Sequence, residues 1–485
     1  MTEVNKIVDE PGKYRQLLVA LIANIAALSL GTMIGWQSPI IPQLQSENPP
    51  VGDRPMTDEE ASWVIGITCV TAAFTSLTVG IIANRFGRKL AGCFMGLPLC
   101  ACWLFTIFAT EHIHLYIARF FSGISGGMVL FLVPMYVSEI ASDGIRGMLG
   151  SLLVFILNGG ILLGYIIGAI LSYRWFAIAM LIFPLFYIAS FVFVPETPVY
   201  LIRRNRIDEA TRSLMWFRGG HVPTVEREIL RLQQETNVSE QTIKLSDLFR
   251  DRATIKGLFI TLGLFAGQQM AGIFIMISYT ETIFKMSGSS LSPNDSAIIV
   301  GAIQVFGSYL STILVERVGR RLLLLTSCLG MGICHYTIGV FCYLQTLQYD
   351  VNQFSWISIL ALSVFMISYG LGMGPGPYVV SSEILNRDIS NLVITMGMFT
   401  AWGMAFVVVK LFPTTVDLLG INGCFFLLGS FCLIIFAFVF MIIPETKGQP
   451  RQLILDRLNG ISHVLDKTKY ISSNDVKIIP KPELI

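Results

Sequence analysis

The residues best suited to chemistry in this sequence are uncharged polar and aromatic side chains inside long apolar runs. Polar groups in such runs are costly in a membrane and usually face a cavity or one another. Amides and hydroxyls hydrogen-bond a neutral solute covered in hydroxyl groups, and aromatic rings pack against its C–H faces. The candidate binding residues are Asn158, Gln268, Gln269, Ser278, Tyr279, Gln304, Tyr378 and Trp402. Interhelical hydrogen bonding or packing is the alternative role for each of them.

Charged residues form a second pattern, because they cluster in glycine-containing turns that occur twice in the chain. Asn84-Arg-Phe-Gly-Arg-Lys89 returns about half a chain later as Glu316-Arg-Val-Gly-Arg-Arg321. Carboxylate–guanidinium pairs between the helix ends at these turns would hold one side of a helix bundle shut. The candidate gate residues are Arg85, Arg88, Glu139, Arg146, Glu316, Arg320, Arg321 and Glu383. Anchoring of the turns at the membrane edge is the alternative.

Membrane-spanning helices must position these residues. Of 485 residues, 53% are apolar and 14% are charged, whereas a soluble domain has about 25% charged residues. A spanning helix needs roughly 20 mostly apolar residues, and such runs recur along the chain. The predicted spans are 16–36, 61–83, 90–110, 113–136, 149–171, 175–194, 257–280, 297–315, 322–343, 356–380, 392–412 and 423–443. The predicted fold class is an all-α membrane protein with twelve transmembrane helices, because a soluble protein of this composition could not cover itself with polar surface.

Internal repeats divide these helices into two related six-helix halves. Besides the glycine turns, Pro134 and Glu139 end the fourth span as Pro377 and Glu383 end the tenth. A Pro-Glu-Thr sequence follows both the sixth and the twelfth span. Parallel repeats of this kind are typical of major facilitator proteins. The predicted units are an N-terminal half at 1–194, a linker with short helices at 195–255, a C-terminal half at 256–443 and a tail at 444–485.

The distribution of Lys and Arg predicts the orientation. The predicted inner connections carry 18 of these residues even without the linker, whereas the outer connections carry three, at Arg54, Arg174 and Lys285. Short connections rich in Lys and Arg stay in the cytoplasm. Both termini, the linker and the tail are therefore predicted to be cytoplasmic, in a multi-pass protein of the cell membrane.

Two Asn-x-Ser sequons test this orientation. Asn237 falls in the predicted cytoplasmic linker, and Asn294 falls in a predicted outer connection, where N-glycans can be added. We expect any glycan to be on Asn294, seen as a mobility shift that Asn294→Gln abolishes when the protein is made in glycosylating cells. A glycan on Asn237 would overturn the orientation.

Enzyme chemistry has little support in the sequence. All nine cysteines lie within apolar spans, so none occupies an outer connection where a disulfide could form, and none has zinc-ligand spacing with His. No nucleophile–base pair or phosphate-binding glycine loop is apparent. The sequence predicts no catalytic residues, no metal, no cofactor and no nucleic-acid partner. Its predicted partners are a small molecule and the lipid bilayer, and it does not indicate an oligomeric state.

The motifs together resemble those of a known family. They are Asn84–Lys89, Arg119–Gly123, Pro134–Glu139 with Arg146-Gly147, Pro195–Pro198, Gln268-Gln269 with Gly272-Ile273, Val315–Arg321, Gly374–Pro377 and Pro444–Gly448. They resemble the sugar porter family of the major facilitator superfamily, and within it the facilitative hexose and facilitated trehalose transporters. The resemblance implies a central sugar site reached alternately from each side. It also implies that Gln268 and Gln269 are the sugar-contacting pair and that Tyr378 and Trp402 occupy tryptophan positions of helices 10 and 11.

The chain departs from the family pattern at several of these positions. An asparagine of helix 7 is replaced by Phe274, the helix-5 glutamine by Val154 and the helix-8 asparagine by Gln304. In helix 11 an asparagine becomes Ala401, and the Arg-Gly expected after helix 10 becomes Ser390-Asn391. The site has therefore lost hydrogen-bonding groups, and the resemblance does not identify the sugar.

None of the twelve predicted spans contains an acidic residue, and residues 16–46, which include the first span, contain none either. Proton-coupled sugar symport normally requires a carboxylate that titrates inside the membrane, but the corresponding stretch reads Gly35-Trp36-Gln37. The expected function is therefore uniport of a hexose or of a small disaccharide such as trehalose. The alternatives are a sugar-sensing receptor that transports weakly, a proton-coupled symporter, and an exporter of apolar compounds, which Phe274 would fit.

Overall fold

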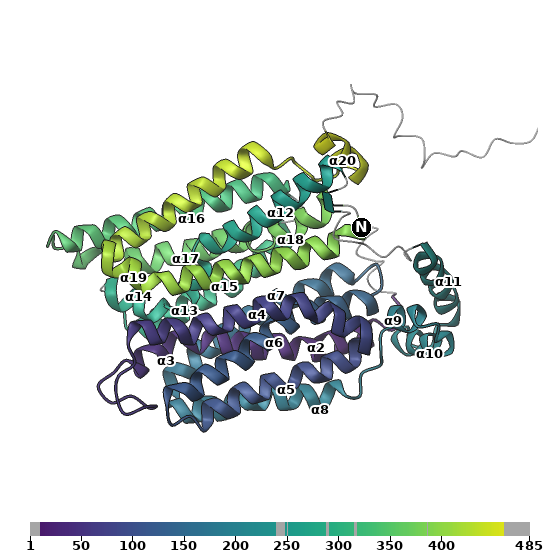
Figure 1. Cartoon of the computed structure of the whole chain (residues 1–485), viewed down its shortest axis with the longest axis horizontal. Coiled ribbons are helices and arrows are strands. Elements are labelled where there is room, and N and C mark those ends of the chain that lie inside the picture. The colour runs from purple at the N-terminus through teal and green to yellow at the C-terminus, as the bar shows by residue number, and fades with distance from the viewer. Residues whose placement is uncertain are drawn as a thin grey trace, which may run out of the picture.

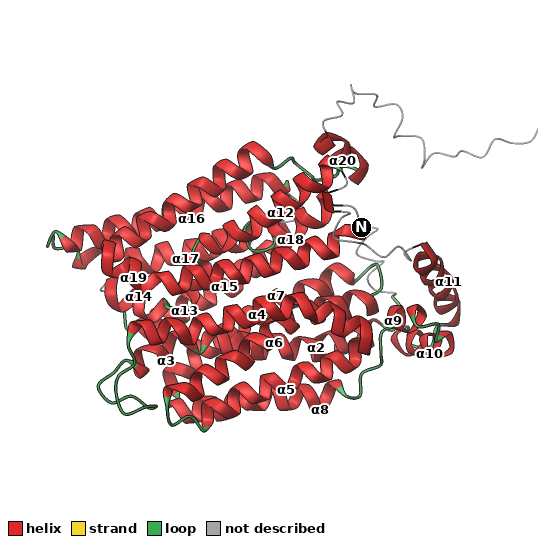
Figure 2. Ribbon diagram, viewed as in Figure 1, coloured by secondary structure: helices red, strands yellow, loops and turns green. Residues whose placement is uncertain are grey.

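The computed structural model describes residues 10–238, 248–249, 251–287, 291–314, 318–385 and 387–459, and every regular element in these ranges is a helix (Figure 2). Long helices follow from the apolar runs, because a backbone surrounded by lipid must satisfy its own hydrogen bonds. The helices form two bundles that lie side by side, one from each half of the chain (Figure 1).

The N-terminal bundle contains seven helical segments. They are α2 (Lys13–Gly35), α3 (Gln37–Leu44), α4 (Asp58–Phe86), α5 (Arg88–Ile107), α6 (His112–Ile140), α7 (Arg146–Ile170) and α8 (Tyr173–Phe191). Three short helices follow in the predicted linker, namely α9 (Pro198–Arg203), α10 (Ile207–Phe217) and α11 (Val222–Val238). These three lie together at one end of the bundles, which we call the linker end; the opposite end is the far end (Figure 1).

The C-terminal bundle contains the remaining segments. They are α12 (Arg252–Met270), α13 (Ile273–Ser278), α14 (Thr280–Ser287), α15 (Pro293–Leu314), α16 (Arg320–Thr346), η2 (Asn352–Phe354), α17 (Trp356–Leu371), α18 (Gly376–Ile384) and α19 (Arg387–Ile442), with α20 (Arg451–Asn459) after it at the linker end (Figure 1). Between the bundles, α4 packs against α19 and α7 packs against α15.

Eleven segments of the described chain are long and apolar enough to cross a membrane. The last of them, Ile389–Ile442, has 54 residues, which at 1.5 Å per residue is about 80 Å and far exceeds a ~30 Å hydrocarbon core. Non-helical backbone at Gly420 divides it. It therefore crosses the membrane twice, and the predicted twelve-helix fold is confirmed.

Three of the twelve transmembrane segments are divided into two helices. The first is divided between α2 and α3 at Trp36, where the backbone keeps a helical conformation. The other two are broken by non-helical backbone in their interior, which the sequence analysis did not predict. The seventh is interrupted between α12 and α13, where Gly272 has a φ of +83° that a side chain would oppose. The tenth is interrupted between α17 and α18 at Gly372–Pro375. A break leaves backbone groups without helical partners, so side chains must satisfy them.

Candidate functional site

Gln268 links the two breaks. Its Nε2 donates to the carbonyl oxygens of Met373 and Gly374 in the tenth segment, at 2.7 and 3.0 Å. The Met373 N–H is in turn bonded to the Ser327 hydroxyl. The amide nitrogen of Gln268 is therefore fully used by the protein, whereas its carbonyl oxygen makes only a weak contact with Gln269.

Gln269 and Gln304 each present a buried oxygen that has no partner among the described residues. The Nε2 of Gln269 lies 3.5 Å from Gln268 Oε1, which is a weak contact. Buried acceptors are normally satisfied, because an unpaired one forfeits the hydrogen bonds it made with water. A hydroxyl-bearing ligand is the kind of molecule that would supply the missing donors.

Asn158 and Gln304 come together across the two halves. Gln304 Nε2 donates to Asn158 Oδ1 at 3.1 Å, and Asn158 Nδ2 lies 2.5 Å from the Ser308 hydroxyl. The contact joins α7 to α15. Both residues thus have interhelical partners, and of their amide oxygens the one on Gln304 remains unpaired.

Aromatic side chains lie among the candidate binding residues, and one of them, Phe274, stands where the family pattern has an asparagine. The ring of Phe274 meets Trp402 edge-on at 5.8 Å, and both side chains are buried. Tyr378 meets the ring of Phe265 edge-on at 4.8 Å but is 38% exposed. These rings are chemically suited to the C–H faces of a sugar.

Ser278 and Tyr279 lie in a contact between the halves at the far end. The Ser278 hydroxyl donates to Gln37 Oε1 at 2.6 Å, so it is already used by the N-terminal half. Tyr165 reinforces this contact by donating to the Ile277 carbonyl oxygen at 2.7 Å. The Tyr279 ring packs against Phe412 in a tilted arrangement, and its hydroxyl has no partner among the described residues.

Lys410 was not singled out from the sequence, although it is the only Lys, and Arg119 the only Arg, inside the twelve predicted spans. Its Nζ lies 3.4 Å from Glu59 and 3.1 Å from the Ser62 hydroxyl of α4, and 4.5 Å from the centre of the Trp63 ring. These contacts cross between the halves at the far end. The rarity of a charge in a span was the signal that could have identified this residue.

Arg119 is completely buried in α6. Its guanidinium lies over the Trp36 ring at 4.1 Å, and Nη1 donates to the Met33 carbonyl oxygen at 3.2 Å. The ring quadrupole attracts a cation placed over its face. Within the described residues, no carboxylate pairs with this arginine.

The gate candidates of the N-terminal half form an ion pair at the linker end. Arg88 Nη2 lies 2.9 Å from Glu139, with side-chain exposures of 2% and 13%, and Thr197 donates to the same carboxylate at 2.5 Å. The neighbouring Glu196 accepts the backbone N–H groups of Arg88 and Lys89 at the start of α5. Burial raises the pKa of the Glu196 carboxyl.

The C-terminal half repeats this arrangement. Arg320 lies 3.1 Å from Glu383, with exposures of 20% and 27%, and Glu445 accepts the N–H groups of Arg320 and Arg321. The glycine before each helix lets the carboxylate lie close to the helix start. A Cβ on Gly87 would lie 2.3 Å from Glu196, and one on Gly319 would lie 2.4 Å from Glu445.

The other gate candidates make local contacts. Arg146 pairs with Asp143 at 2.8 Å rather than with Glu139, the Arg85 guanidinium lies over Phe86, and Arg321 donates to the Phe440 carbonyl oxygen. Glu316 lies outside the described residues. Each described ion pair of the gate candidates joins elements of one half, so their role in closing the bundle remains a prediction.

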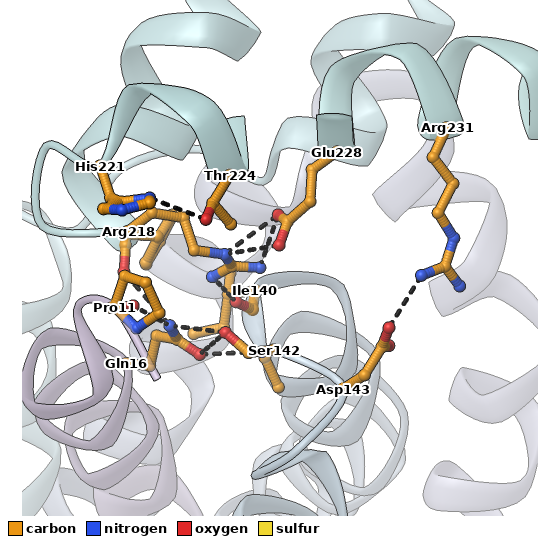
Figure 3. A network of polar contacts seen from close by, with 12 residues as sticks. Pro11, Gln16, Ile140, Ser142, Asp143, Arg218, His221, Thr224, Glu228 and Arg231 are labelled. Atoms are coloured by element: carbon orange, nitrogen blue, oxygen red, sulfur yellow. Dashed lines mark hydrogen bonds and ion pairs between the residues drawn. The ribbon is translucent and has the colours of Figure 1, made fainter. Parts of the chain in front are cut away.

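The linker is fastened to the N-terminal half by a polar network (Figure 3). Arg218 pairs with Glu228 at 2.9 Å and donates to the Ile140 carbonyl oxygen at the end of α6. Arg231 reaches Asp143 at 2.8 Å, and this hydrogen bond lowers the pKa of the Asp143 carboxyl. A cavity of about 360 Å³ lies beside α9 and α10, and none of the candidate binding residues lines it.

These features define the class of protein: a multi-pass membrane transporter with the major facilitator fold. The chain belongs to the sugar transporter family, since the family model described as "Sugar (and other) transporter" matches residues 19–455. The family consists of membrane transporters and not of enzymes.

Individual relatives are similar over most of the chain. The facilitated trehalose transporter Tret1 of Apis mellifera ligustica is 32% identical over 463 residues, which are 95% of this chain and 91% of the relative. Tret1 of Aedes aegypti is 30% identical over 92% of this chain, which spans only 55% of that longer protein.

Solved structures support the fold. The inward open conformation of the xylose transporter XylE from E. coli superposes with a TM-score of 0.75 at 20% identity, covering 91% of this chain and 99% of that one. The partially occluded inward open conformation of XylE gives a TM-score of 0.72, covering 89% of this chain and 98% of that one. At this level of identity the likeness bears on the fold alone.

Proposed function

We propose that this protein is a facilitative uniporter that carries a hexose or a trehalose-like disaccharide across a membrane by alternating access. The observation that carries the uniport assignment is the environment of Arg119. A buried cation opposite a carboxylate forms a pair that a proton can break, whereas the Trp36 ring and a backbone carbonyl hold no exchangeable negative charge. The contacts of the Arg119 guanidinium therefore do not depend on the protonation of a carboxylate.

The chemistry of the candidate site supports a neutral, hydroxylated substrate. The unpaired oxygens of Gln269 and Gln304 call for donors, and Phe274, Tyr378 and Trp402 offer apolar faces. Relatives named as trehalose transporters support a disaccharide among the sugars to be tested first.

One carboxylate favours proton coupling as a second candidate function. Glu281 lies one residue beyond the predicted seventh span, its side chain is half-buried, and its Oε2 has no partner among the described residues. Its N–H donates to the Ser38 hydroxyl, so the residue lies at the contact between the halves. A coupled mechanism would have to use this group.

The experiment compares the parent with Glu281→Gln in proteoliposomes, using labelled glucose, fructose and trehalose. We expect both proteins to equilibrate sugar at a rate that a proton gradient leaves unchanged, and both to exchange internal for external sugar. Accumulation against the gradient that a protonophore collapses, and that Glu281→Gln loses, would refute uniport. Saturable binding with no uptake of any sugar would favour the receptor alternative.

A further inference from the structure

The break in the seventh segment leaves backbone oxygens that helix geometry cannot satisfy, and the Ala271 carbonyl oxygen is one of them. On its N-terminal side the Ala271 and Gly272 N–H groups bond to Gly267 and Gln269, and on the other side Met276 bonds to Gly272. The Ala271 carbonyl falls between these bonds, and no backbone N–H of the described residues donates to it. In a bundle interior without water, such an oxygen is costly unless a side chain reaches it.

His335 of α16 reaches this oxygen. Its Nε2 lies 3.0 Å from the Ala271 carbonyl oxygen, and the imidazole, which is 1% exposed, lies between the rings of Phe365 and Phe425. A carbonyl oxygen only accepts, so Nε2 carries the proton in this contact. The aromatic surroundings favour the uncharged ring, whose Nδ1 has no partner among the described residues.

The residues beside this contact are those of the candidate sugar site. Gln268 and Gln269 lie three and two residues before Ala271, and Phe274, which contacts Trp402, follows it on α13. Holding the Ala271 carbonyl fixes the angle between α12 and α13, and thereby the relative positions of the two glutamines and Phe274. The backbone carbonyl oxygen of Gln269 accepts the Gly272 N–H. The same turn therefore contains this hydrogen bond and the one from His335 to Ala271.

We propose that His335 is a positioning residue for substrate: its Nε2–H holds the broken seventh segment in the geometry that binds sugar. The proposal rests on the proposed transport function and deepens it. According to this proposal, sugar affinity depends on the hydrogen-bond donor of His335 and not only on the volume of its ring.

Three variants separate the donor from the bulk. His335→Phe keeps a ring and removes the donor, whereas the amide of His335→Gln extends to about the position of Nε2 and restores it. His335→Asn is polar but too short to reach. Cys342→Ala is the matched packing control, because Cys342 is buried on the same helix and no side-chain hydrogen bond is found for it among the described residues.

The measurements are KM and kcat for uptake of labelled glucose and trehalose by full-length protein in proteoliposomes. Leaving a buried acceptor unpaired disfavours the conformation that buries it. The equilibrium constant for that conformation falls by about five- to a hundredfold. We expect His335→Phe and His335→Asn to raise KM within that range with little change in kcat. His335→Gln and Cys342→Ala should stay within about threefold of the parent. Equal KM increases in the Phe and Gln variants, or an unchanged KM in the Phe variant, would overturn the proposal.

A second readout needs no sugar. Hydrogen exchange of the backbone around residues 268–276 should quicken in His335→Phe and return to the parent rate in His335→Gln. If the parent carries no sugar but this pattern holds, the proposed function fails while the structural part of the inference stands. If the Phe variant exchanges like the parent, His335 does not hold the break.

Discussion

Glu139→Ala is expected to lower the stability of the protein by about 3–5 kcal/mol, because it leaves a buried guanidinium without its carboxylate. Arg88 is 2% exposed, and after the change its guanidinium keeps, among the described residues, the Ala83 carbonyl and the face of the Tyr200 ring. The effect is measured as the thermal unfolding midpoint of the purified protein, together with transport per molecule. We expect sugar binding at equilibrium to change little, because the pair lies at the linker end of α5 and α6.

The C-terminal half offers a matched control. Glu383→Ala removes the corresponding carboxylate, but Arg320 and Glu383 are 20% and 27% exposed, so water can solvate the remaining charge and the loss should be about 1 kcal/mol. Replacing Arg88 and Glu139 together by leucine should recover much of the stability, since no unpaired charge is left. Equal losses in the two single variants would contradict the assignment of the effect to burial.

Gln268→Ala is expected to weaken sugar binding by about ten- to a hundredfold. The substitution removes the Oε1 atom that we propose accepts from a sugar hydroxyl, and it also leaves the Met373 and Gly374 carbonyls without their donor. Each unsatisfied partner costs roughly 1–3 kcal/mol, or about tenfold for every 1.4 kcal/mol. Equilibrium binding of labelled sugar measures the change. The thermal unfolding midpoint without sugar should fall as well.

Gln269→Ala is the control for that prediction. Its Nε2 makes only a weak contact at 3.5 Å and its Oε1 has no partner among the described residues. Binding should therefore weaken while the sugar-free protein keeps its stability. If Gln268→Ala binds and carries sugar like the parent, the central site is misplaced, and the seventh segment is a packing element only.

The sequence was sufficient to predict the helices because membrane insertion depends on local composition. The repeated glycine turns also predicted the paired linker-end motifs. In the structure a glutamate, Glu196 or Glu445, accepts the backbone N–H groups at the helix start that follows each turn. The breaks near Gly272 and Gly372 were missed, since a short interruption leaves the mean hydropathy of a span unchanged. Contacts such as Lys410 with Glu59, or Arg119 with Trp36, depend on how helices rotate about their axes, which composition does not determine.

Non-helical backbone interrupts α12–α13 and α17–α18, and both of these segments belong to the C-terminal bundle. In the other bundle α2 and α3 are divided at Trp36, but the backbone there stays helical, and this bundle also holds the more deeply buried ion pair. A continuous helix moves as one rigid element, whereas an interrupted helix can bend at the interruption. In mechanical terms the two bundles are a stiff body and a compliant one. Deformation around a captured molecule would concentrate in the compliant body, while the stiff body, with the linker helices fastened to it, would serve as the frame.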